Sequence, residues 1–153
     1  MPWALSEDSA AFFGATAGRA IPLFAAGDHA GALDAFLTGA FGPGYRRALD
    51  RALPDAWSTA VKDAPTAFAV ELPAVQQWDV GRDDLGRARV PTLSVVINEP
   101  RWPGFGETHA ALQDAIPGCE GIVVDVGSHL LQVADPGRVA AVVSAFLARH
   151  PLT

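Results

Sequence analysis

The sequence predicts an α/β fold in which a helical region, residues 1–88, precedes a β-α-β-α segment, residues 89–153. The first region places apolar residues at helical spacing between Gly and Pro breaks, and it shows no strand pattern. The second region contains two short β-branched runs, at 92–97 and 121–126, each followed by a helical pattern. Because these runs alternate little with polar residues, we expect strands of a parallel sheet that is covered on both faces.

The helical region begins with a capping signal. Ser6 is a good N-cap, and the two carboxylates after it favour the positive end of a helix that runs toward Ala26. Gly27 ends this helix and Asp28 caps a second one, which Gly42-Pro43-Gly44 ends. Three shorter helical pieces follow, at Tyr45 to Leu53, Asp55 to about Val61 and Thr66 toward Leu72, with Pro54 and Pro65 as breaks.

The β-α-β-α segment follows a polar connection, predicted from Gln76 to Arg89. Its elements are a strand from Thr92 to Ile97, a helix from Phe105 to Ala115, a strand from Gly121 to Val126, and a closing helix with an apolar face of Val139, Val142, Val143, Phe146 and Leu147. Asp135 and Pro136 supply the N-cap and first-turn proline of that closing helix. Two parallel strands are too few for a stable sheet, so we expect a missing segment, a second copy or a separately supplied polypeptide to complete it.

The composition also indicates a missing partner. Of 153 residues, 50% are hydrophobic and 18% are charged, against about 25% charged in an average soluble domain. We therefore expect some apolar surface to face a partner chain, a missing domain or a small apolar ligand.

Charge and cysteine content exclude several classes of protein. The net charge is −6 and the eleven Lys and Arg residues are scattered, which argues against a nucleic-acid partner because phosphate binding requires clustered basic residues. Cys119 is the only cysteine, so no intrachain disulfide forms and a reducing cytoplasm is compatible. No run approaches the roughly 20 apolar residues of a membrane span, so no membrane partner is expected.

The most informative residues, Gly127-Ser128-His129, follow the second predicted strand. A histidine there stands at the carboxyl edge of a parallel sheet, where open α/β sheets place their sites. The succession of strand, helix ending at Ile116-Pro117, strand, Gly-x-His, Pro136 and a helix with Phe146-Leu147 resembles the C-terminal part of the α/β-hydrolases. The resemblance is specific from Pro91 onward. The helices before it are similar to the lid that these enzymes insert ahead of their last strands.

The resemblance implies a Ser-His-acid hydrolase in which His129 is the general base. The family's nucleophile stands in a Gly-x-Ser-x-Gly turn, and no serine of this sequence has that pattern. Met1 to Leu5 resembles the end of the strand before the lid, so the nucleophile is expected upstream of residue 1 and this chain alone is expected to be inactive. The family's usual Gly-x-x-Asp is replaced by Ile97-Asn98-Glu99-Pro100, and Glu99 is the candidate acid within the chain. An acid from an earlier strand, outside the chain, is the alternative.

Other reactive residues have simpler interpretations. Ser128 is expected to be a turn residue, and Cys119 a loop cysteine separated from His129 by the second strand. His29, His109 and His150 show no metal-ligand spacing, so no metal site is expected. No Gly-rich phosphate loop follows a strand, so no cofactor is expected.

Three functions remain open at this point. The first is hydrolysis of an ester or similar small apolar substrate by the complete form of an α/β-hydrolase. The second is a non-catalytic module, derived from the same fold, that dimerises, pairs with a complementing hydrolase fragment or binds an apolar ligand. The third compares Phe24-x-x-Gly27-Asp28 with small cone-shaped proteins of the polyketide-cyclase type, but that fold needs a long antiparallel sheet that the second half does not provide.

Overall fold

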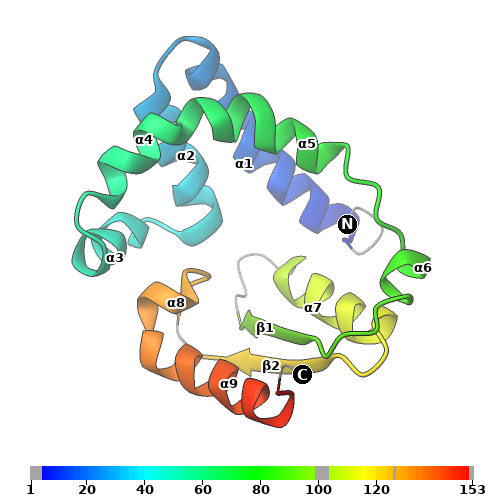
Figure 1. Cartoon of the computed structure of the whole chain (residues 1–153). Helices are drawn as coiled ribbons and strands as arrows, with labels where there is room; N and C mark the ends of the chain where they lie inside the picture. The colour runs from blue at the N-terminus through cyan, green and yellow to red at the C-terminus, as the bar shows by residue number, and fades with distance from the viewer. Residues whose placement is uncertain (1–4, 99–103, 126, 152–153) are drawn as a thin grey trace. The chain divides into compact units, whose positions relative to one another are not determined.

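Helices make up most of the described chain, and two strands form one small parallel sheet (Figure 1). The structure, a computed structural model, describes residues 5–98, 104–125 and 127–151. Residues Ala10–Asp79 form one compact unit, here called the helical unit. Met1–Ser9 and Val80–Thr153 form a second, here called the sheet unit. The predicted order of a helical region before a β-α-β-α segment is confirmed, with the units dividing at 79/80 where the sequence predicts 88/89.

The first helices begin where the capping signals predict. α1 (Glu7–Ala25) starts after Ser6, whose hydroxyl accepts a hydrogen bond from the Ser9 amide at 3.2 Å. Gly27 ends that helix with a φ of 83°, in the left-handed region that favours glycine. The Asp28 carboxylate then accepts from the Gly31 amide at 2.8 Å and caps α2 (His29–Phe41). These side chains satisfy amides that a helix start leaves without a partner.

The prediction that Pro65 ends a helix is wrong. α3 (Tyr45–Ala52) is followed by α4 (Ala56–Thr66), and Pro65 lies inside α4. The helical path continues through a π-helical segment, η2 (Ala67–Glu71), into α5 (Leu72–Gln76). The Leu72 amide donates to the Ala67 carbonyl, five residues back. A proline removes one amide donor, and a wide turn beside it allows the chain to continue without an α-helical bond at every position.

The core of the helical unit joins α1, α2, α4 and η2. Its buried members are Ala20, Ala32, Leu33, Ala64 and Phe68. The Phe68 ring stacks on Phe24 with centroids 5.1 Å apart and meets Phe36 edge to face at 6.0 Å. Aromatic pairs in these arrangements add to the free energy gained by burying their area.

The sheet unit contains the predicted β-α-β-α order. β1 (Leu93–Ile97), α7 (Gly104–Ala115), β2 (Glu120–Val124) and α9 (Pro136–Arg149) correspond to the predicted elements. The strands are parallel, with Val95 opposite Ile122. The Asp135 carboxylate accepts from the Arg138 amide at 2.9 Å and caps α9. Two short helices, α6 (Arg82–Leu85) and α8 (Leu131–Ala134), were not predicted.

α7 and α9 cover opposite faces of the strand pair (Figure 1). On one face, Ser94 hydrogen-bonds His109 of α7, and a side chain at Gly121 would collide with Gln113 of α7. On the other face, Glu120 forms ion pairs with Arg149, at the end of α9, and His150 just after it. Since neighbouring residues of a strand point to opposite faces, these contacts assign one helix to each face.

The prediction that both strands are covered on both faces is wrong for β2. Val124 is 1% exposed, but Val123 is 58% exposed, on the same face of β2 as Gly121. Among the described residues, the sheet consists of β1 and β2 alone, so each has an outer edge with no described strand beside it. The described part of this chain therefore buries less of the sheet than its sequence pattern predicts.

Candidate functional site

His129 lies in the loop that leaves the carboxyl end of β2. β2 ends at Val124, and α8 begins at Leu131. Because β1 and β2 are parallel, the loop after Ile97 leaves the sheet at the same edge. This is the edge at which open α/β sheets place their sites. The structure therefore places His129 where such a site is expected.

Backbone geometry shapes this loop. Gly127 has a φ of 68°, a conformation that L side chains rarely adopt. The Ser128 hydroxyl accepts a hydrogen bond from the Leu130 amide at 3.2 Å, an interaction typical of turns. The predicted role of Ser128 as a turn residue is confirmed. The Arg138 guanidinium of α9 donates to the Asp125 carbonyl at 3.5 Å at the start of the same connection.

The His129 imidazole stacks on the ring of Phe105, which the sequence did not single out. The ring centroids are 3.6 Å apart and the ring planes differ by 15°. Phe105 lies in the first turn of α7, which follows the loop after β1. A helix that follows a parallel strand begins near the carboxyl edge of the sheet, and this position was the signal that could have linked Phe105 to His129.

Glu99, the predicted acid, lies outside the described residues.

A second polar cluster lies between β1 and α7. The Ser94 hydroxyl and the His109 Nδ1 are 2.7 Å apart, and His109 is 9% exposed. Burial lowers the pKa of His109, which favours the neutral imidazole. Ser94 is the second residue of β1, so this cluster lies toward the amino end of the strand, whereas His129 follows the carboxyl end of β2. The pair fastens α7 to the sheet.

Cys119 belongs to the neighbourhood of this cluster. It precedes β2, and its sulfur lies 3.7 Å from the Glu120 carbonyl oxygen. Burial raises the pKa of the Cys119 thiol. Because the thiolate is the nucleophilic form, a raised pKa favours an unreactive thiol. Cys119 lies in the loop where the sequence predicts it.

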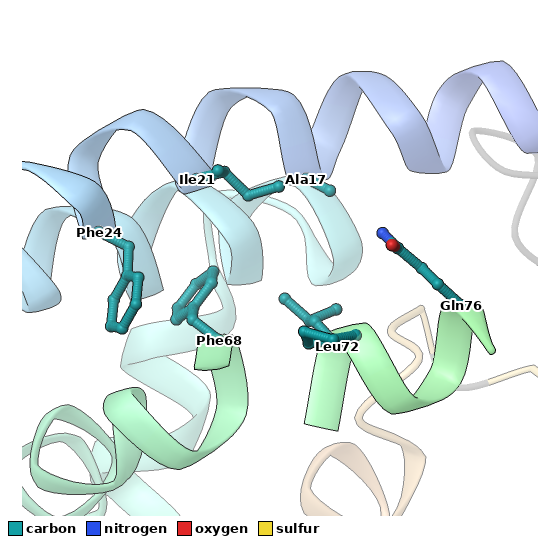
Figure 2. A pocket seen from close by; sticks show the side chains of 7 residues that line it. Ala17, Ile21, Phe24, Phe68, Leu72 and Gln76 are labelled. Atoms are coloured by element: carbon teal, nitrogen blue, oxygen red, sulfur yellow. The ribbon is translucent and has the colours of Figure 1, made fainter. Parts of the chain in front are cut away.

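The helical unit contains an apolar pocket of about 220 Å³. Figure 2 shows Ala17, Ile21 and Phe24 of α1 facing Phe68, Leu72 and Gln76 of the η2–α5 segment across it. Pro73 completes the lining, and of these residues only Gln76 is polar. An apolar cavity of about 150 Å³ is large enough for benzene, so this pocket accommodates a small apolar molecule.

The described residues contain neither a cluster of metal ligands nor a helix suited to spanning a membrane. Within residues 5–98, 104–125 and 127–151, no three His, Cys, Asp or Glu side chains gather so as to hold a metal ion. In the same part of the chain, no helix combines the length and the apolar character that crossing a bilayer requires.

Comparison of the chain with protein-family models, with curated proteins and with solved structures finds no match.

Proposed function

We propose that this chain is the lid and C-terminal segment of an α/β-hydrolase, in which His129 acts as the general base in hydrolysis of an ester of a small apolar acid or alcohol. The observation that carries the proposal is the position of His129 in a glycine-shaped loop at the carboxyl end of β2. In the complete site, His129 takes the proton of the serine hydroxyl during attack and later gives it to the leaving group.

The nucleophile must come from another segment under this proposal. No serine in the sequence stands in a Gly-x-Ser-x-Gly turn. The outer edges of β1 and β2 have no described strand beside them, so further strands of a larger sheet could pair with them. The exposed Val123 side chain is consistent with a face that such a segment covers.

The helical unit, taken by itself, contains an apolar pocket that suits an uncharged ligand. Its lining of Ile21, Phe24, Phe68 and Leu72 offers no charged partner, and Gln76 supplies one amide group. Pockets that combine apolar walls with few polar groups bind uncharged ligands and orient them by those groups. An uncharged ester with a short apolar chain fits this description.

The test is to co-express the chain with the segment encoded upstream of it that carries a strand and Gly-x-Ser-x-Gly, and to follow hydrolysis of 4-nitrophenyl butyrate. The pair should turn over the ester, and the isolated chain should not. His129→Ala should reduce kcat by about a million-fold, as loss of the histidine does in other Ser-His-acid hydrolases. Ser128→Ala is the matched control and should retain most of the turnover, because its hydroxyl serves a turn. Unchanged turnover in His129→Ala, or the absence of any such upstream segment, would refute the proposal.

A second candidate is a non-catalytic module that dimerises through its open sheet edges. The observation in its favour is that β1 and β2 form the whole sheet of the described residues. Analytical ultracentrifugation of the isolated chain separates the two candidates. A tight dimer of the isolated chain that binds butyrate esters without hydrolysing them favours this module. A monomer that assembles only with the upstream segment favours the hydrolase.

A further inference from the structure

In the sheet unit, the ring of Phe105 stacks on the imidazole of His129, the proposed base. The centroids are 3.6 Å apart and the planes differ by 15°. A flat contact of this kind restricts rotation of the imidazole about its side-chain torsions, because turning the ring would drive it into its neighbour. The face of an aromatic ring also attracts a cation placed over it.

The helix that carries Phe105 is fixed at two further places. One turn along α7, His109 hydrogen-bonds Ser94 of β1 at 2.7 Å. In the first turn, the Glu107 carboxylate accepts from the Ser6 amide at 2.9 Å and from the Ser6 hydroxyl at 2.7 Å. These bonds lower the pKa of Glu107, so it stays ionised and keeps accepting both bonds over the physiological range of pH. Phe105 therefore projects from a helix that is held at two positions shortly after it, Glu107 and His109.

We infer that Phe105 is a positioning residue for His129, which holds the imidazole plane at the sheet edge and favours the imidazolium that forms during proton transfer. The inference depends on the proposed function for its catalytic meaning, but the ring contact can be measured without any turnover. The Phe105 ring takes no part in the proton transfer itself. The proton passes from the serine hydroxyl to the imidazole and then to the leaving group.

The experiment is ¹H and ¹³C NMR of the imidazole groups in the isolated chain as a function of pH, with the His129 signals assigned by their loss in His129→Gln. In the unaltered chain, the His129 ring protons should show nuclear Overhauser contacts to Phe105 and an upfield ring-current shift. Phe105→Leu keeps apolar cover but removes the aromatic face. It should abolish the upfield shift and lower the pKa of His129 by about 0.5. Phe105→Tyr keeps the aromatic face and should restore both properties.

The charged side chains nearest in sequence to His129 are not altered by either substitution. Asp125, at the start of the loop, and Arg138 of α9, whose guanidinium donates to the Asp125 carbonyl, are the same in both variants. A pKa that stays the same or rises in Phe105→Leu, or missing Overhauser contacts in the unaltered chain, would overturn the inference. The Overhauser readout needs no substitution of Phe105, so a Phe105→Leu chain that fails to fold does not remove the test. If the ring contact is found but His129→Ala leaves turnover intact in the co-expressed pair, the proposed function fails and the contact remains.

Discussion

The Ser94–His109 contact gives a quantitative test of how α7 is held to the sheet. Ser94→Ala removes the hydroxyl that lies 2.7 Å from the His109 Nδ1. His109 is 9% exposed, so water cannot readily replace the hydrogen bond that its Nδ1 loses. A buried polar group left without its partner costs about 1–3 kcal/mol. Because Ser94 is itself only partly buried, we expect a loss in the lower half of that range, about 1–2 kcal/mol.

Urea unfolding followed by circular dichroism measures this loss as a lower midpoint with an unchanged slope. The matched control is Thr92→Val, which removes an exposed hydroxyl that donates to the Val90 carbonyl at 3.0 Å. Surface changes of this kind usually alter stability by less than about 0.5 kcal/mol. If Ser94→Ala costs no more than Thr92→Val, the contact does not hold α7 in place and the account of this face of the sheet is wrong.

Four further predictions have defined outcomes. Phe68→Ala should cost the helical unit about 3–5 kcal/mol, measured by urea unfolding, because the ring is buried against two other aromatic rings; a loss under 1 kcal/mol would contradict this core. Asp135→Ala should cost about 0.5–2 kcal/mol and Asp135→Asn only a few tenths, since asparagine can also cap α9; equal losses would exclude a capping role. Burial lowers the pKa of His109 from 6.5 in the folded chain, so the unfolded chain binds a proton at this imidazole more readily than the folded chain does. The free energy of unfolding should therefore fall as the pH drops below about 6.5. His109→Gln should flatten this part of the pH profile. Hydrogen bonds from His150, and then from Arg149, lower the pKa of Glu120 in the folded chain. The stability that ionised Glu120 contributes should therefore be complete above the ordinary carboxyl range and be lost as the pH falls through the folded pKa. Glu120→Gln should remove this step from the pH profile of stability.

Local signals in the sequence predicted the elements well where each signal acts within a few residues. Ser6, Asp28 and Asp135 each cap the helix that the sequence assigns to them. Such caps depend on a side chain three residues from the amide that it accepts from, so no distant contact is needed to find them. The order of strands and helices followed from periodicity in the same way.

The remaining features depend on contacts between distant residues or on unusual backbone. Pro65 continues a helix because the π-helical η2 follows it, and hydrophobic spacing does not reveal a change from α to π hydrogen bonding. Burial of Val123 was overestimated because a β-branched run indicates what a strand is suited to, without showing what covers it. The ring of Phe105 reaches His129 across a separation of 24 positions, and no short-range pattern specifies which aromatic residue occupies that place.

The outer edge of β1 affects how the chain behaves in solution. The strand Leu93-Ser94-Val95-Val96-Ile97 contains neither a charge nor a proline, two of the devices by which natural sheets keep an exposed edge from recruiting further strands. Short, uncharged, β-branched segments of this kind are also the segments that stack into fibrils. We therefore expect the shelf life of the purified chain to fall steeply with its concentration, even when each molecule remains folded. A polypeptide that covers this edge would then act as a solubility partner as well as a structural one.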